Sequence, residues 1–123
     1  MADKLQNKRI AFLVAPEGVE QVELTEPWKA IEEAGGTPEL LSIKKGEIQG
    51  FDHFDKADTF PVDHVVDQVE PGWYDALMIP GGALNPDNLR MDERAELLVA
   101  LHPGPVFGPP LCPGAVRRLA VGL

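Results

Sequence analysis

Short apolar runs alternate with longer segments of helical periodicity along most of the chain. The run at residues 10–15 is continuous and apolar, as expected for a strand that is buried on both faces of a parallel sheet. Residues 19–34 then carry apolar side chains at helical spacing and end at Gly35-Gly36, a common signal for the end of a helix. The pattern therefore predicts a strand followed by a helix.

Two further apolar runs continue this alternation. Residues 39–43 and 73–79 each predict a buried strand. Between them, a short β extension is expected at residues 47–51, and residues 56–69, which fit no single period, are predicted to form a short strand and a loop. Strands that alternate with helices in this way indicate an α/β fold built on a parallel sheet.

The C-terminal part of the chain begins as a helix and then changes in composition. Residues 93–102 predict a helix capped by Asp92, with one apolar face made of Leu97, Leu98 and Leu101. Residues 103–123 contain five prolines, four glycines and no acidic residue, so only Val106-Phe107 can pair well as a strand. We therefore divide the chain into an α/β domain at residues 1–102 and a divergent Pro/Gly-rich tail at residues 103–123.

The charge balance and the cysteine count exclude several classes of protein. A formal net charge of −9 argues against nucleic acid and against an anionic membrane surface as partners. No apolar run is long enough to span a membrane, and no signal peptide is visible at the N-terminus. A single cysteine excludes an internal disulfide, so we expect a cytoplasmic location.

Glu23 is the most informative polar residue of the first predicted helix. At about 100° per residue it falls in the middle of an apolar stripe made of Val19, Val22, Pro27, Ala30, Ile31 and Ala34. A carboxyl group on a packing face is costly unless it is paired or protonated, so we interpret Glu23 as a candidate functional residue. The alternative is a helix that begins only at Pro27 and leaves Glu23 in a solvated turn.

Two other segments could carry chemistry. Pro80-Gly81-Gly82 follows a predicted strand, where glycine lets the backbone approach a ligand, although an ordinary strand-ending turn has the same sequence. Cys112 is the candidate nucleophile, but Pro113 restricts its backbone to extended conformations, and a free thiol in an irregular tail is the alternative. Dinucleotide-binding and P-loop motifs are absent from the sequence.

Two of the histidines lie near acidic residues. His53 follows Asp52, and His64 lies between two aspartates, at spacings that could contact a divalent ion. Neither group forms a tight set of ligands along the sequence. We therefore predict no metal site and no cofactor.

Several consecutive motifs resemble the PfpI family of intracellular proteases and deglycases, which is related to class I glutamine amidotransferase domains. They follow one another in order from residue 8 to about residue 102 and comprise residues 8–15, 18–27, 32–36, 74–82, 85–90 and 92–95. The resemblance implies a flavodoxin-like α/β sandwich of three layers with a parallel sheet. It also implies a homo-oligomer.

The same resemblance assigns roles to individual residues. The family has a cysteine nucleophile on a strand-to-helix elbow, and a carboxyl that hydrogen-bonds its sulfur; by motif position that carboxyl belongs to Glu23. Glu20 is the first glutamate of the same signature, and Asp87 occupies the position of an acid that completes a neighbouring subunit's site. Gly81 and Gly82 would offer N–H groups to an oxyanion beside the nucleophile.

The sequence departs from the family pattern at the elbow. The family has Cys-His-Gly there, whereas Cys112 is followed by Pro113 and comes about two positions late in the motif. The family's last strands and helices have no counterpart in this sequence. We therefore expect a fold that is incomplete at its C-terminus, as an out-of-frame or truncated gene would produce.

These observations predict a PfpI-like stress-response protein, ancestrally a cysteine-dependent hydrolase or deglycase of small carbonyl or peptide substrates. Because the histidine is missing, we expect this chain to be weakly active or inactive. One alternative is a non-catalytic module that oligomerises or binds a partner through its uncovered sheet edge and apolar helix faces. The other is a redox sensor that acts through Cys112 alone.

Overall fold

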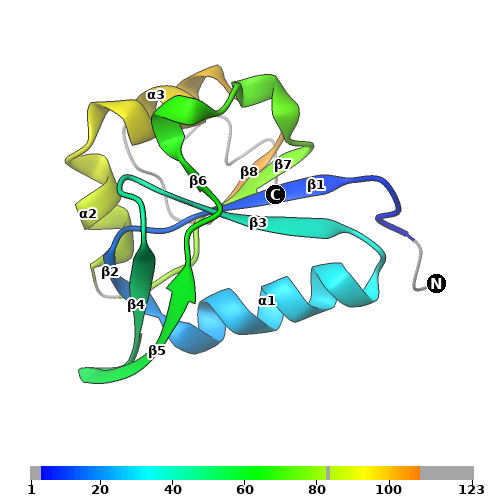
Figure 1. The fold of residues 1–123 in the computed structure, drawn as a ribbon. Helices are drawn as coiled ribbons and strands as arrows, with labels where there is room; N and C mark the ends of the chain where they lie inside the picture. Colours follow the sequence, from blue (N-terminus) through cyan, green and yellow to red (C-terminus); the bar gives the residue numbers. More distant parts are fainter. Residues whose placement is uncertain (1–3, 83, 109–123) are drawn as a thin grey trace.

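A five-stranded parallel sheet forms the centre of the molecule in the computed structural model, which describes residues 4–82 and 84–108 (Figure 1). Its spatial order is β6-β3-β1-β7-β8, with bounds β1 (Arg9–Leu13), β3 (Thr37–Ser42), β6 (His64–Val65), β7 (Ala76–Met78) and β8 (Val106–Phe107). Counted along the chain, the five strands stand in the order 3-2-1-4-5. Without the two-residue edge strand β6, the remaining four stand in the order 2-1-3-4, which is the strand order of flavodoxin-like folds. The predicted parallel α/β fold is confirmed.

Strand β1 is buried on both faces, as its continuous apolar run predicts. It pairs in parallel with β3 on one side and with β7 on the other. Ala11 and Leu13 point into a core cluster shared with the helix near the end of the described chain, whereas Ile10 and Phe12 point into a second cluster shared with the first helix. Because successive side chains of a strand point to opposite faces of the sheet, β1 contributes side chains to both core clusters.

Helix α1 (Gln21–Glu33) covers one face of the sheet (Figure 1). The side of the helix that faces inward differs from the one that the sequence suggests. Leu24 is buried and the Trp28 ring lies 5.2 Å from the ring of Phe12, whereas Val22 is 55% exposed. The predicted stripe through Val22 and Glu23 is therefore wrong as the main packing face. Turning the large side chains Leu24 and Trp28 inward buries more apolar area than Val22 and the small residues of the predicted stripe would.

The opposite face of the sheet carries α2 (Asn85–Arg90) and α3 (Glu93–Leu101) (Figure 1). Asp92 caps α3 as predicted, because its side chain accepts hydrogen bonds from the backbone N–H groups of the helix's first turn. The predicted apolar face is corrected, since the buried residues of α3 are Ala95, Leu98 and Val99. Leu97 and Leu101 are more than half exposed. The inward face follows the i, i+3, i+4 spacing from Ala95.

A smaller sheet of three strands lies beside the start of α1. It consists of β2 (Glu17–Glu20), β4 (Glu47–Asp52) and β5 (Asp55–Pro61), in the order β2-β4-β5. The β extension predicted at residues 47–51 is confirmed as β4, which forms an antiparallel hairpin with β5. Two short 3-10 turns, η1 (Val66–Gln68) and η2 (Pro71–Trp73), lead into β7. Within the described part of the chain, no helix is both long and apolar enough to cross a membrane.

Candidate functional site

The topology of the main sheet places a switch point at the carboxyl ends of β1 and β7. The chain leaves β1 toward β3 on one side, and it later returns to form β7 on the other side. Ligands of open α/β sheets bind at such a switch point. The segment after β7 is Pro80-Gly81-Gly82, and the segment after β1 leads through β2 into the first turn of α1. Several residues singled out from the sequence therefore come together here.

The Glu23 carboxyl group lies directly against the backbone of Gly81. A Cβ atom added at Gly81 would overlap Glu23 Oε1 and would stand 3.2 Å from Glu23 Oε2. Only glycine therefore leaves room for the carboxyl in this position. Because α1 begins at Gln21, Glu23 belongs to its first turn, and the alternative of a helix that starts at Pro27 is wrong.

The surroundings of Glu23 differ from those expected on a packing face. Its side chain is exposed, because the first turn of α1 lies at the end of the sheet, where Leu24 and Trp28 already occupy the inward side of the helix. Glu23 thus combines an open side with a close contact to Gly81. A carboxyl in this arrangement can accept a hydrogen bond from a group that approaches its open side.

Gly82 lets two backbone segments approach each other closely. Its φ of +133° lies in a region that L side chains rarely adopt, and a Cβ there would overlap Gly18 O and stand 2.6 Å from Glu20 N. The Glu20 N–H donates a hydrogen bond of 3.1 Å to the Gly81 carbonyl. Gly81 and Gly82 therefore bring the chain after β7 into close backbone contact with the end of β2. An ordinary strand-ending turn does not need this contact.

Asn85 fixes the two strand ends relative to each other, and the sequence reading assigned it no role. Its side chain is fully buried, accepts a hydrogen bond of 2.7 Å from Ala15 N and donates one of 2.8 Å to the Pro80 carbonyl. It thus bridges the chain after β1 and the chain after β7. The feature of the sequence that could have pointed to Asn85 is its position between the glycine turn and Pro86, at the start of a short helix.

Glu20 and Asp87 lie near the switch point but contact other partners. Both oxygens of the Glu20 carboxylate accept a hydrogen bond from the backbone N–H of His53, at 3.1 Å each. The Asp87 carboxylate is exposed in the first turn of α2 and forms an ion pair of 3.0 Å with Arg90. The role of Asp87 in a neighbouring subunit's site stays a prediction.

Strand β8 pairs with β7 and ends beside the same switch point. Ile79 N–H donates a hydrogen bond of 2.8 Å to the Phe107 carbonyl, and a Cβ added at Gly108 would overlap the carbonyl oxygen of Ile79. The predicted pairing of Val106-Phe107 as a strand is confirmed. Cys112 follows a few residues later and lies outside the described residues.

A parallel sheet with a glutamate and two glycines at its switch point defines the class of flavodoxin-like α/β proteins. The sequence profile of the DJ-1/PfpI family matches residues 8–102. The chain belongs to the DJ-1/PfpI family, as its motifs predict.

Individual relatives agree with this assignment. The chain is 38% identical over 88 residues to the "Putative cysteine protease YraA" of Bacillus subtilis, covering 72% of this chain and 49% of the relative. It is 37% identical over 87 residues to the "Deglycase PfpI" of Pyrococcus furiosus, covering 71% of this chain and 49% of the relative. The chain therefore spans about half the length of these relatives.

Solved structures share the fold. A ThiJ/PfpI domain protein from Brachyspira murdochii superimposes with a TM-score of 0.74 at 22% identity, covering 95% of this chain and 65% of that one. A cysteine-to-alanine mutant of a DJ-1 superfamily protein from Salmonella typhimurium gives a TM-score of 0.70 at 21% identity, covering 80% of this chain and 53% of that one. Both comparisons support the flavodoxin-like architecture.

Proposed function

We propose that the chain binds a small carbonyl or peptide substrate at this switch point and turns it over weakly through Cys112. The observation that carries the proposal is the Glu23 carboxyl lying against Gly81 at the switch point of the sheet. In this mechanism Glu23 holds the cysteine sulfur, and the thiolate attacks the carbonyl carbon of the substrate. The N–H groups of Gly81 and Gly82 then polarise the carbonyl oxygen.

The expected turnover is weak because the proton-transfer group is missing. The family's histidine after the cysteine is replaced by Pro113, which carries no titratable group. General acid–base catalysis typically contributes about 10²–10⁴-fold to a rate. The two substrate classes are supported by the names of the relatives, one a deglycase and the other a putative cysteine protease.

The link between Glu23 and Cys112 can be tested on thiol reactivity, because the sequence has a single cysteine. We expect Glu23→Gln to change the pH profile of Cys112 alkylation by iodoacetamide, since it removes the carboxyl that is proposed to hold the sulfur. Glu26→Gln, an exposed glutamate on the same helix, is the matched control. Identical profiles for the wild type and Glu23→Gln would contradict the proposed contact.

Turnover itself is tested by the consumption of methylglyoxal, with the Pyrococcus furiosus deglycase as reference. We expect a rate at least about a hundredfold below the reference, given the missing base, and we expect Cys112→Ser to abolish it. A rate equal to the reference, or one that survives Cys112→Ser, would refute the proposed mechanism.

A second function, assembly with another copy of the chain, is supported by an apolar groove beside α1. The groove has a volume of about 660 Å³ and its lining includes Ile10, Pro27, Ala30, Ile31, Met78 and Phe107. It lies on the α1 face of the sheet, where Met78 and Phe107 stay only partly buried. A groove of this kind is typical of an interaction surface.

Light scattering coupled to size-exclusion chromatography tests the assembly. We expect a dimer or larger species, and we expect Ala30→Lys to yield monomers because it places a charge on the groove wall. Leu97→Lys, at an exposed apolar position of α3, should leave the assembly intact. A monomeric wild type would contradict this second function. A cytoplasmic location and a role in stress defence stay predictions.

A further inference from the structure

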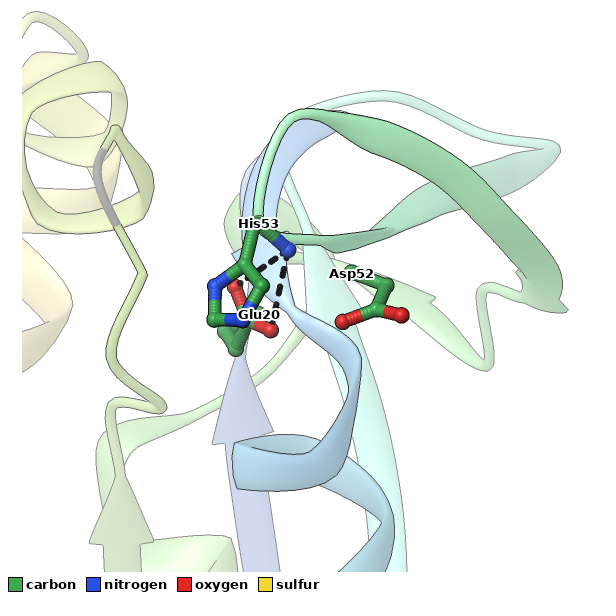
Figure 2. Close-up of side chains that lie close together, drawn as sticks. All are labelled: Glu20, Asp52 and His53. Carbon is green, nitrogen blue, oxygen red and sulfur yellow. Dashed lines mark hydrogen bonds between the residues drawn. The ribbon is translucent and has the colours of Figure 1, made fainter.

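The turn between β4 and β5 brings together three side chains that are typical metal ligands. Glu20 is the last residue of β2, Asp52 is the last residue of β4, and His53 follows in the turn. One possible ligand atom from each residue lies within 4.8 Å of the other two. Figure 2 shows the three side chains gathered where the turn passes the end of β2.

The backbone fixes the central member of this cluster. Strand β2 pairs in parallel with β4, so that Glu20 lies beside Phe51. The His53 N–H then donates to both Glu20 carboxylate oxygens at 3.1 Å (Figure 2). His53 itself has a φ of +59°, in the left-handed region. These hydrogen bonds hold the Glu20 carboxylate beside the turn that carries Asp52 and His53.

We propose that Glu20, Asp52 and His53 bind one divalent transition-metal ion of the zinc type. An imidazole nitrogen with carboxylate oxygens suits zinc and similar ions, whereas magnesium and calcium prefer oxygen ligands alone. Three protein ligands with a remaining position open to water is the composition of an open zinc site. A bound cation also relieves the repulsion between the Glu20 and Asp52 carboxylates.

The geometry requires only a small movement of exposed side chains. Ligand atoms around a tetrahedral zinc ion stand about 3.4 Å apart, given metal–ligand bonds of about 2.0–2.2 Å. The present separations reach 4.8 Å at most, and Asp52 and His53 are exposed while Glu20 is partly buried. Rotation of the Asp52 and His53 side chains toward the Glu20 carboxylate brings the three ligand atoms to the spacing that one metal ion requires. The sequence pairs His53 with Asp52 but gives no sign of Glu20 as a third member, because Glu20 lies 33 residues before His53.

Calorimetric titration with zinc chloride tests the proposal. The titrations use Cys112→Ser protein, so that the thiol contributes no binding, and magnesium chloride serves as the comparison ion. We expect one zinc ion per chain and no comparable binding of magnesium. His53→Asn, which tolerates the left-handed backbone, and Asp52→Asn should each weaken zinc binding by about a hundredfold or more, since loss of even an outer-sphere partner costs about 10–100-fold.

Two controls separate this cluster from general surface binding. Asp55→Asn removes an exposed carboxylate from the same hairpin, and His64→Gln removes a histidine that lies 3.5 Å from Glu39 instead. Both variants should bind zinc like the parent protein, and thermal melts should show all variants folded. Absence of zinc binding in the parent, unchanged affinity in His53→Asn, or an equal loss in His64→Gln would each overturn the proposal.

Discussion

Gly81 and Gly82 are adjacent in the chain, but an added methyl group meets very different neighbours at the two positions. At Gly81 it meets the far end of the flexible Glu23 side chain, which can move away. At Gly82 it meets the backbone of residues 18–20 at a positive φ, where neither side can yield. The two glycines therefore have different roles. Gly81 leaves room for the Glu23 carboxyl group, whereas Gly82 lets its backbone lie close to that of residues 18–20.

This contrast predicts unequal effects on stability. We expect Gly82→Ala to lower the free energy of unfolding by about 2–4 kcal/mol, from overpacking and backbone strain, and Gly81→Ala to lower it by less than about 1 kcal/mol. Urea denaturation measures both. Gly72→Ala, where an added Cβ meets nothing within 4 Å, is the control. Equal losses at Gly81 and Gly82 would contradict the geometry.

Tyr74 forms a buried polar cluster with two charged residues. Its hydroxyl donates a hydrogen bond of 2.9 Å to Glu39, which in turn forms an ion pair of 2.9 Å with Arg9. The Arg9 guanidinium also stands 4.9 Å from the centre of the Tyr74 ring. Burial, followed by the hydrogen bond to Glu39, raises the pKa of the Tyr74 phenol well above its ordinary value of 10.0.

Stability should therefore fall in alkaline solution. Above pH 10 the unfolded chain loses the phenol proton while the folded chain keeps it, so rising pH favours unfolding. Thermal melts should show this loss in the wild type, and Tyr74→Phe should remove the contribution. Because the sequence has one tyrosine, phenolate absorbance reports Tyr74 alone. Ionisation of the folded protein near pH 10 would contradict the prediction.

At the level of elements, the sequence pattern predicts the existence and order of the main strands and helices better than it predicts which sides of the helices face inward. The apolar run of β1 is unambiguous, because a strand buried on both faces needs apolar side chains everywhere. In α1 and α3, more than one side of the helix carries enough apolar residues to pack against the sheet, so the pattern alone does not decide which side faces inward. The choice of Leu24 over Val22, and of Val99 over Leu97, depends on what the sheet offers opposite them.

The candidate site shows the same division between local and long-range information. Gly81 and Glu23 could be singled out from local pattern and family motif. Asn85 and the meeting of Glu20 with His53 could not, because both depend on contacts between segments far apart in the chain. Such contacts follow from sheet order and register, which the periodicity of one segment does not encode.

The start of α3 depends on its cap. The Asp92 side chain accepts hydrogen bonds from Arg94 N at 2.9 Å and Ala95 N at 3.2 Å, and the Arg94 guanidinium lies 3.0 Å from its other oxygen. The hydrogen bond from the Arg94 side chain is the largest cause that lowers the pKa of Asp92 below its ordinary 3.8. The cap is therefore a charged one.

Removing this cap should cost about 1–2 kcal/mol of unfolding free energy at neutral pH. We expect Asp92→Ala to show this loss in urea denaturation, and Asp92→Asn, which keeps a capping oxygen, to show a smaller one. Because the folded pKa of Asp92 is lowered, the charged contribution is present above pH 3.8 and fades as the pH falls below it. A loss that grows on acidification would contradict this reading.

At the scale of the whole molecule, the two core clusters lie on opposite faces of one sheet. They share β1, whose alternate side chains enter each cluster, and Leu40 and Leu41 of β3 are divided in the same way. If the packing on one face is lost, the side chains of β1 and β3 on that face become exposed, and the same two strands also support the cluster on the opposite face. The described part of the chain should therefore unfold as one unit.

The two tryptophans allow this to be measured. Trp28 packs against the α1 cluster, whereas Trp73 lies in η2 near Arg9 and His64. We expect Trp28→Phe and Trp73→Phe, each with one remaining tryptophan, to show a tryptophan fluorescence transition that coincides with the far-ultraviolet transition of the same variant. Separate midpoints for the two probes within one variant would indicate that the faces unfold independently.

Pro27 sits in the interior of α1, one turn after Glu23. Proline has no N–H, so the carbonyl of Glu23 receives no hydrogen bond from the residue that would normally supply it. The turn that carries the carboxyl is thus tied to the rest of the helix by fewer backbone bonds than its neighbours are. The packing of the buried Leu24, which belongs to the same turn, therefore helps to hold the Glu23 carboxyl in place.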